Sequence, residues 1–233
     1  MLGIIGGMGP AASSLFYDMI TEDTAAASDQ ENLDLILISR ASMPDRTGAI
    51  LSRDKAKLEA VKRKLLKDAL FLSEAGCGAI CVTCNTAHYF VDMIENDVPV
   101  PFIHMIRETA AELENDFAGK TVAVLATDGT IKTKLYQREL AARGITPYIP
   151  TQEAQSLIMS EIYDHIKGGR HADADMWKRI EGEIMSAGAG AAILACTELS
   201  VIKNQLTLSD YYYDPMEIMA ARAVSLFRER GEI

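Results

Sequence analysis

The chain has 233 residues, of which 48% are hydrophobic and 24% are charged. This length fits one large domain or two small lobes, and the composition excludes disordered, collagen-like and membrane-spanning classes. The formal net charge of −10 repels phosphate backbones and anionic lipid surfaces, so we expect neither a nucleic-acid partner nor a membrane partner. The opening residues MLGIIGGMGP lack the basic and apolar regions of a signal peptide, so we expect a cytoplasmic protein.

Short apolar segments alternate with longer amphipathic segments, which is the pattern of a parallel sheet covered by crossover helices. In chain order the predicted elements are a strand at Leu2–Ile5, a helix at Pro10–Ala26, a strand at Leu33–Ile38, a helix at Lys55–Ala75, a strand at Ala79–Thr83, a helix at Ala87–Ile94, a strand at Pro101–Ile103, a helix at His104–Phe117, a strand at Thr121–Ala126, a helix at Ile131–Ala142, a strand at Pro147–Ile149, helices at Gln152–Lys167 and Ala174–Ala187, strands at Ala191–Ala195 and Tyr211–Asp214, and a helix at Pro215–Arg230. The sequence therefore predicts the α/β class.

An internal repeat divides this pattern into two halves. Residues Ala75–Cys84 resemble residues Ala187–Cys196 at an offset of 112, and both read as helix end, glycine turn, buried strand and cysteine. Residues Gly3–Gly9 resemble Ala123–Gly129 at an offset of 120. Although strand-to-turn glycines are common, the repeated cysteine is harder to explain by chance. The chain therefore reads as two copies of one α/β unit.

The repeat places Cys84 and Cys196 at the carboxyl ends of equivalent strands, where ligands bind in open parallel sheets. Two lobes that face one another would put these thiols on opposite sides of one bound molecule. One thiolate could then remove a proton from a tetrahedral carbon while the other thiol supplies a proton to the opposite face. The expected reaction is racemisation or epimerisation.

Polar residues follow each cysteine and suggest helix N-termini, which lower the pKa of a thiol. They are Asn85 and Thr86 after Cys84, and Thr197 and Glu198 after Cys196. The anionic Glu198 would raise the pKa of the neighbouring thiol, or it could hold the ammonium group of a substrate.

Two cations, Arg46 and Lys167, are candidates for binding a substrate carboxylate. The glycines around Gly7–Pro10 could form a dinucleotide-binding loop, but Ala12 stands where the GxGxxG motif needs glycine. We interpret this segment as an anion-binding or close-approach turn, with Met8 and Gly9 among the substrate-binding residues.

The spacing Cys77-x3-Cys81-x2-Cys84 is that of a radical-type iron–sulfur cluster, and the last two could form a zinc or redox pair. Side chains on a straight strand alternate between faces, however, so the second and third cysteines should point apart. We therefore expect no metal, and read Cys77 and Cys81 as buried core residues. The four histidines lack metal-ligand spacing and are read as structural or surface residues; they are His88, His104, His165 and His171.

Several motifs together resemble the PLP-independent aspartate/glutamate racemase family, and the resemblance runs nearly end to end. They are GGMGP at 6–10, PDRT at 44–47, TCNTAH at 83–88, CTE at 196–198 and DPMEIMA at 214–220. The resemblance implies two pseudo-symmetric three-layer lobes, each a mostly parallel sheet flanked by helices, with the active site between them. It also implies a homodimer without metal, nucleotide or PLP.

The resemblance assigns Cys84 and Cys196 as the two catalytic acid/bases, and Arg46 and Lys167 as the substrate-binding cations. It further implies that the remaining site positions line the cavity; these are Asn85, Thr86, Thr127 and Thr197. The expected substrate is an acidic amino acid, with interconversion of L- and D-aspartate as the first choice. We expect residues 1–104 and 209–233 to form the N-terminal lobe, and residues 105–208 the C-terminal lobe.

Other activities stay open at this stage. Glutamate or another amino acid could be the substrate. A decarboxylase or cis–trans isomerase of a small dicarboxylic acid would need only one of the two cysteines. A non-catalytic protein that binds an acidic amino acid could use the same crevice between the lobes.

Overall fold

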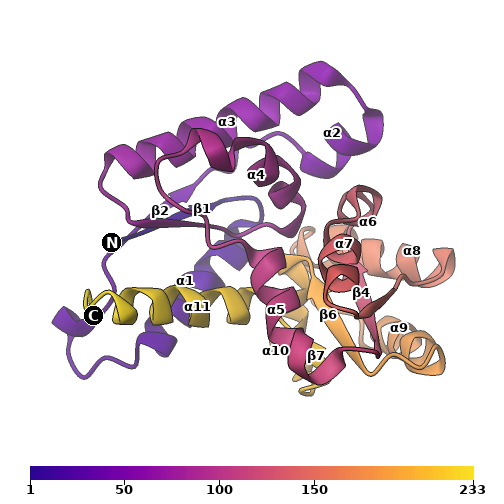
Figure 1. Ribbon diagram of the computed structural model, residues 1–233. Helices are drawn as coiled ribbons and strands as arrows, with labels where there is room; N and C mark the ends of the chain where they lie inside the picture. The colour runs from indigo at the N-terminus through magenta and orange to yellow at the C-terminus, as the bar shows by residue number, and fades with distance from the viewer.

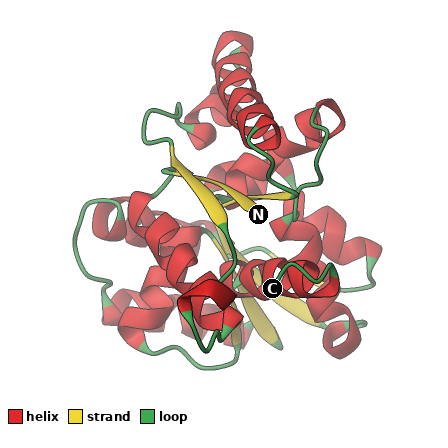
Figure 2. Cartoon of the chain, turned by 90° about the vertical axis from the view of Figure 1, so that its left-hand side faces the viewer, coloured by secondary structure: helices red, strands yellow, loops and turns green.

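Two parallel β-sheets, one in each half of the chain, form the centre of the structure, a computed structural model that describes residues 1–233. The first sheet has the order β2–β1–β3 and the second has the order β5–β4–β6–β7. A single parallel bridge from Ile80 to Phe102 adds the predicted strand segment Pro101–Ile103 to the edge of the first sheet. The strands are β1 (Leu2–Gly6), β2 (Leu35–Ser39), β3 (Ala79–Val82), β4 (Thr121–Ala126), β5 (Thr146–Tyr148), β6 (Ala191–Ala195) and β7 (Tyr212–Tyr213). Figure 2 shows the two sets of strands enclosed by helices.

The register of the two sheets repeats at the offsets found in the sequence. Leu2 of β1 lies opposite Ala79 of β3, and Val122 of β4 lies opposite Ala191 of β6. The first members of these pairs are 120 residues apart and the second members are 112 residues apart. The predicted α/β class and the two-lobed duplication are therefore confirmed at the level of strand pairing.

Helices cover both faces of the first sheet, which makes the first lobe three layers thick (Figure 1). One face packs against α3 (Lys55–Glu74) and α4 (His88–Ile94), and the other packs against α1 (Pro10–Thr24) and α11 (Pro215–Glu229). The short helix α2 (Arg46–Ser52) follows β2 and contacts the second lobe.

The second sheet is covered in the same way. One face packs against α8 (Gln152–Ser160), α9 (Ala174–Ser186) and α10 (Thr197–Leu206). The other face packs against α5 (Met105–Phe117) and α7 (Leu135–Ala142), with α6 (Asp128–Thr133) beginning directly after β4. The 3₁₀ turns are η1 (Asp29–Glu31), η2 (Asn85–Ala87) and η3 (Glu95–Asp97), and η4 (Glu161–Ile166) is a π-helix.

Two helices cross from the lobe whose strand precedes them to the opposite lobe. α5 follows the Phe102 segment of the first sheet but packs on the second, through Ile106, Ala110 and Leu113. α11 follows β7, which pairs with β6, but packs on the first sheet. The two crossing helices contact each other at the centre of the molecule (Figure 1). Residues 209–233, which we expected in the N-terminal lobe, are therefore divided. Their strand β7 belongs to the second sheet, and their helix α11 belongs to the first lobe.

The helices differ from the sequence prediction in four places. The helix predicted at Ile131–Ala142 is two helices, because Lys134 adopts a left-handed conformation with φ of 57°. The helix predicted at Gln152–Lys167 changes from α to π geometry at Glu161. The helix α2 was not predicted, although Asp45 caps it by accepting from two backbone N–H groups. For α10 the sequence indicated only the N-terminus, at the polar residues after Cys196.

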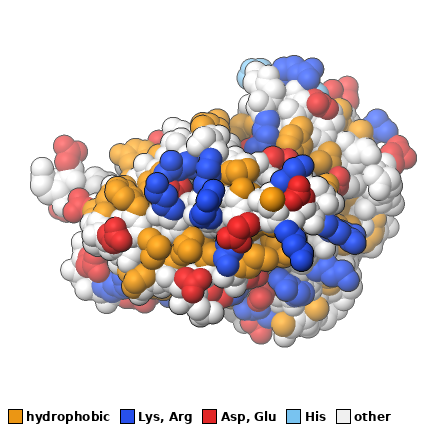
Figure 3. Space-filling view, turned by 90° about the horizontal axis from the view of Figure 1, so that it is seen from above, with side chains coloured by type: hydrophobic (Ala, Val, Ile, Leu, Met, Phe, Trp, Pro, Cys, Tyr) orange, Lys and Arg blue, Asp and Glu red, His pale blue; other side chains and the backbone are white.

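The surface over α2 and α3 differs in charge from the chain as a whole. Figure 3 shows lysine and arginine side chains gathered on this face, although the chain carries a net charge of −10. None of the helices combines the length and the apolar character that a membrane crossing requires.

Candidate active site

Cys84 and Cys196 occupy equivalent places in the two lobes. Cys84 follows β3 and caps η2 with φ and ψ of −161° and 113°, and Cys196 follows β6 and caps α10 with φ and ψ of −151° and 134°. Both side chains are buried, with exposed fractions of 7% and 6%. They line the same small cavity between the lobes, which measures about 20 Å³.

This inner cavity brings together the residues that the sequence analysis selected, apart from Gly9. Its lining includes both cysteines and the two candidate cations, together with Met8, Asn85, Thr86, Thr127, Thr197 and Glu198. Five of its residues, Met8, Arg46, Tyr163, Lys167 and Glu198, also line an outer chamber of about 430 Å³, where Gly9 is found. A larger groove of about 870 Å³ lies between α1, α5 and α11, but it contains neither cysteine.

The Cys84 side of the cavity carries two buried hydrogen-bond donors without a partner, Arg46 Nε and Asn85 Nδ2. The other guanidinium nitrogens of Arg46 donate to the carbonyl oxygens of Pro44 and Met8, both at 3.2 Å. Burial opposes the charge on Arg46, but Cys84 is the largest of the neighbours that raise the pKa of its guanidinium. Each of these two donors lacks an acceptor, and an unmade buried hydrogen bond costs about 1–3 kcal/mol.

The Cys196 side of the cavity is acidic. The thiol of Cys196 donates to Glu198 Oε2 at 3.0 Å. Burial raises the pKa of this thiol well above its usual value, and the charge of Glu198 raises it further. Of the two effects expected at Cys196, the increase in thiol pKa caused by Glu198 is the one found, because desolvation and the neighbouring carboxylate outweigh the helix N-terminus.

Lys167 forms an ion pair with Glu198 across the mouth of the inner cavity. Its ammonium group also reaches the carbonyl oxygen of Met8 at 3.4 Å, and its side chain is 26% exposed. The π-helix η4 sets this orientation, because the Lys167 N–H bonds to the carbonyl of Ile162, five residues earlier.

The Gly9 position is a close-approach turn. Its φ of 140° disfavours other residues, and a Cβ there would lie 2.3 Å from Glu198 Oε1. A glycine in the first lobe thus makes room for a carboxylate of the second.

Threonine hydroxyls join the lobes beside the cavity. Thr86 Oγ1 in the first lobe lies 2.9 Å from both Thr127 Oγ1 and Thr130 Oγ1 in the second. Thr47 Oγ1 donates to Thr127 Oγ1 at 3.4 Å. These contacts place the first turns of η2 and α6 against each other.

Sequence reasoning missed three residues of the site. Thr47 and Tyr163 line the inner cavity. Tyr136 does not line it, but its hydroxyl donates a hydrogen bond to Asn85 Oδ1 at 2.5 Å. The first lies in the PDRT motif and the second in the segment IYDHIKGG that contains Lys167. The Tyr136 bond orients the Asn85 amide so that its NH2 group is the part left to bind a ligand.

The other two cysteines lie away from the cavity. Cys81 packs in the core between the first sheet and α1 and α11, whereas Cys77 and Cys84 pack on the opposite face. The prediction that Cys81 and Cys84 point to opposite sides of the sheet is confirmed. Both Cys77 and Cys81 are buried, and burial raises the pKa of each thiol.

The sequence profile of the Asp/Glu/hydantoin racemase family matches residues 5–223. The chain belongs to this family. It is therefore a racemase of the Asp/Glu type, with the cavity between its lobes as the candidate active site.

Similar proteins in this racemase family cover the whole chain. A broad-specificity amino-acid racemase, RacX of Bacillus subtilis, is 26% identical over 97% of this chain and 98% of its own. The structure of an aspartate racemase from Picrophilus torridus superposes with a TM-score of 0.79 at 28% identity, covering 99% of this chain and 94% of that one. An aspartate racemase homologue from Pyrococcus horikoshii superposes with a TM-score of 0.75 at 25% identity, covering 97% of each chain.

Proposed function

We propose that this racemase interconverts the L and D forms of an acidic amino acid, aspartate first, by two-base proton transfer between Cys84 and Cys196 without PLP. The observation that carries the proposal is that two cysteines at equivalent strand ends line one small cavity between the lobes. One thiolate takes the Cα proton and leaves a carbanion that is delocalised into the carboxylate. The other thiol then delivers its proton to the opposite face, which inverts the centre.

The surroundings of the two cysteines differ in charge. Cys196 rests as the thiol, because it donates to Glu198 and burial raises its pKa. Cys84, beside the guanidinium of Arg46, is the cysteine that would remove the first proton in this proposal. Each turnover exchanges the two states, and catalysis from the other enantiomer restores them.

The charged groups fit an α-amino acid. The unpartnered donors Arg46 Nε and Asn85 Nδ2 would bind the α-carboxylate, and the Arg46 charge together with the Asn85 N–H group would stabilise the negative charge that develops there during proton removal. Glu198 would bind the α-ammonium group, and Lys167 would then be released to the side-chain carboxylate of aspartate.

Substrate binding must widen the inner cavity, because about 20 Å³ holds roughly one water molecule. The Lys167–Glu198 ion pair lies between the two chambers and would have to open. A zwitterionic amino acid offers a charge to each partner, so opening the pair need not leave a buried charge unpaired.

The test is incubation of the purified protein, without PLP and with a metal chelator, with L-aspartate in D2O. Loss of optical activity together with deuterium at Cα, measured by NMR, is the expected result. Racemisation that depends on added PLP would refute the mechanism. If L-aspartate stays unchanged while another amino acid racemises, only the choice of aspartate fails, and the likeness to RacX makes a panel of amino acids the next step.

The homodimer expected from the family resemblance remains a prediction. Sedimentation equilibrium at micromolar protein concentration would test it directly.

A further inference from the structure

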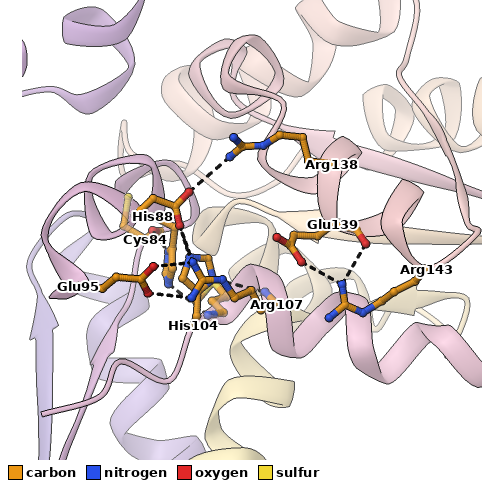
Figure 4. Close-up of polar contacts among 10 residues, drawn as sticks. Cys84, His88, Glu95, His104, Arg107, Arg138, Glu139 and Arg143 are labelled. Atoms are coloured by element: carbon orange, nitrogen blue, oxygen red, sulfur yellow. Dashed lines mark hydrogen bonds and ion pairs between the residues drawn. The ribbon is translucent and has the colours of Figure 1, made fainter.

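His88 lies in direct contact with the backbone of Cys84 but outside the cavity. Its Nδ1 is 3.0 Å from the carbonyl oxygen of Cys84, and its Nε2 accepts the backbone N–H of Met105 at 3.2 Å. The side chain has no exposed surface. Figure 4 shows His88 beside Cys84, with His104 and Arg107 next to it.

The two hydrogen bonds define the form of the imidazole. Burial and the neighbouring His104 lower the pKa of His88 to about 3, so the ring is neutral at physiological pH. Because Nε2 accepts from Met105, the proton of a neutral ring is on Nδ1, which donates to the Cys84 carbonyl. His88 therefore acts as a fixed link from one backbone to another and cannot serve as a proton carrier here.

The link joins Cys84 to the start of a helix that crosses between the lobes. Cys84 follows β3 of the first sheet, and Met105 is the first residue of α5. The Met105 side chain packs in the core of the first lobe, whereas Ile106 and the following turns of α5 pack on the second sheet. Behind His88, the ring of His104 lies at 4.6 Å between centroids and contacts Asp92 at 3.2 Å. Asp92 also accepts from Arg138 of α7 at 3.4 Å, so a further ion pair spans the lobes there (Figure 4).

The second lobe has a different link at the equivalent place. Ser200 stands four residues after Cys196, as His88 does after Cys84, and its hydroxyl donates to Asp214 at 2.8 Å. Asp214 caps α11, the helix that crosses back to the first lobe. In each lobe the residue four positions after the cysteine thus contacts the start of a crossing helix.

We propose that His88 is a positioning residue that ties Cys84 to α5, so that the placement of the second lobe sets the approach of the Cys84 sulfur to Cα. The inference rests on the two-cysteine mechanism proposed above. Proton transfer requires the reacting atoms within about 3–3.5 Å, and a misplacement of about 1 Å can cost about 100-fold in rate. A loosened Cys84 loop therefore slows the step at this cysteine selectively.

Two substitutions separate the halves of the link. In His88→Asn the amide NH2 can replace the Nδ1 donor, whereas in His88→Gln the amide oxygen can replace only the Nε2 acceptor. We expect kcat/KM to fall about tenfold in either variant, because each loses one of the two hydrogen bonds that join Cys84 to Met105, and one lost hydrogen bond corresponds to about tenfold.

Isotope effects identify the step that slows. With Cα-deuterated substrates, His88→Gln should increase the isotope effect on kcat/KM for the enantiomer deprotonated by Cys84 and decrease it for the other enantiomer. Ser200→Ala should show the reverse. A merely structural role would lower both rates without opposite changes in the two isotope effects, and that outcome overturns the proposal.

Alkylation provides a readout that does not need racemase activity. The rates at which iodoacetamide modifies Cys84 and Cys196 are measured by mass spectrometry in the wild type and the variants. His88→Gln should change the rate at Cys84 at least threefold and leave Cys196 unchanged; equal changes, or none, refute the link. If the wild type racemises no amino acid but His88→Gln changes the alkylation rate of Cys84 alone, the proposed function fails while the positioning role stands.

Discussion

The two lobes present the same backbone and opposite electrostatics at their cysteines. Each cysteine follows one strand of a parallel sheet, β3 for Cys84 and β6 for Cys196, and caps the helical turn that comes next. The backbone dihedral angles of the two cysteines are nearly the same. Cys84, however, lies beside the guanidinium of Arg46, whereas Cys196 donates to the carboxylate of Glu198. The duplicated fold thus places two cysteines in equivalent backbone positions, whereas the charged side chains beside them differ between the lobes.

Removing either thiol is the strongest test of this comparison. Cys84→Ala and Cys196→Ala should each lower kcat for racemisation by about 10²–10⁴-fold, since each removes a general acid/base. Cys81→Ala is the matched control, because Cys81 is buried in the opposite core and should retain activity. Circular dichroism checks folding in all three. Near-normal turnover in one of the two cysteine variants would point to a single-cysteine reaction.

The acidic side of the comparison is tested by Glu198→Gln. This change removes one of the two main causes that raise the pKa of the Cys196 thiol, so that pKa should fall. The alkaline limb of the pH profile of kcat/KM should then move to lower pH, and KM should rise because the proposed ammonium ligand is lost. Glu153→Gln, on the exposed surface, is the control. An unchanged alkaline limb would mean that Glu198 does not control the Cys196 proton.

A smaller effect, on stability, is expected from the hydrogen-bonded links beside the two cysteines. The link in the first lobe contains the neutral His88, and the corresponding link in the second lobe contains the titratable Asp214. Burial raises the pKa of Asp214 to about 6 from 3.8, so the folded state takes up a proton that the unfolded state has already lost in this range. This proton uptake makes the free energy of unfolding decrease as pH rises from about 4 to 6, by up to about 3 kcal/mol.

Asp214→Asn should remove that slope and keep the cap, since the amide oxygen can still accept from Ser200 and Met216. Urea unfolding between pH 4 and 7 measures it, with His88→Asn as the control that leaves the slope in place. A slope that persists in Asp214→Asn would assign the titration to another group.

The strands and the cysteine pair were predictable from the sequence for a clear physical reason. Strands such as Thr121–Ala126 and Ala191–Ala195 are buried on both faces, and a mostly apolar run after a glycine turn marks them directly. The repeated strand end then placed Cys84 and Cys196 without knowledge of how the lobes pack. Local sequence was sufficient wherever burial alone fixes the structure.

The missed features depend on contacts between elements or on backbone geometry without a residue signature. Nothing in IYDHIKGG marks a π-helix, so the orientation of Tyr163 and Lys167 could not be derived. The seven-residue α2 is too short and too polar at its start for a periodic signal. The bond from Tyr136 to Asn85 crosses the lobes, and no spacing within the chain predicts it.

The exchange of α5 and α11 between the lobes suggests how such a chain could arise by gene fusion. It also predicts whether the two halves can fold as separate fragments. Each half of the sequence ends in a helix that covers the sheet of the other half. A half-length ancestor with this architecture would have been a domain-swapped dimer, which gene fusion then made permanent. For the same reason, fragments 1–117 and 118–233 should be insoluble when expressed alone and should complement each other when expressed together.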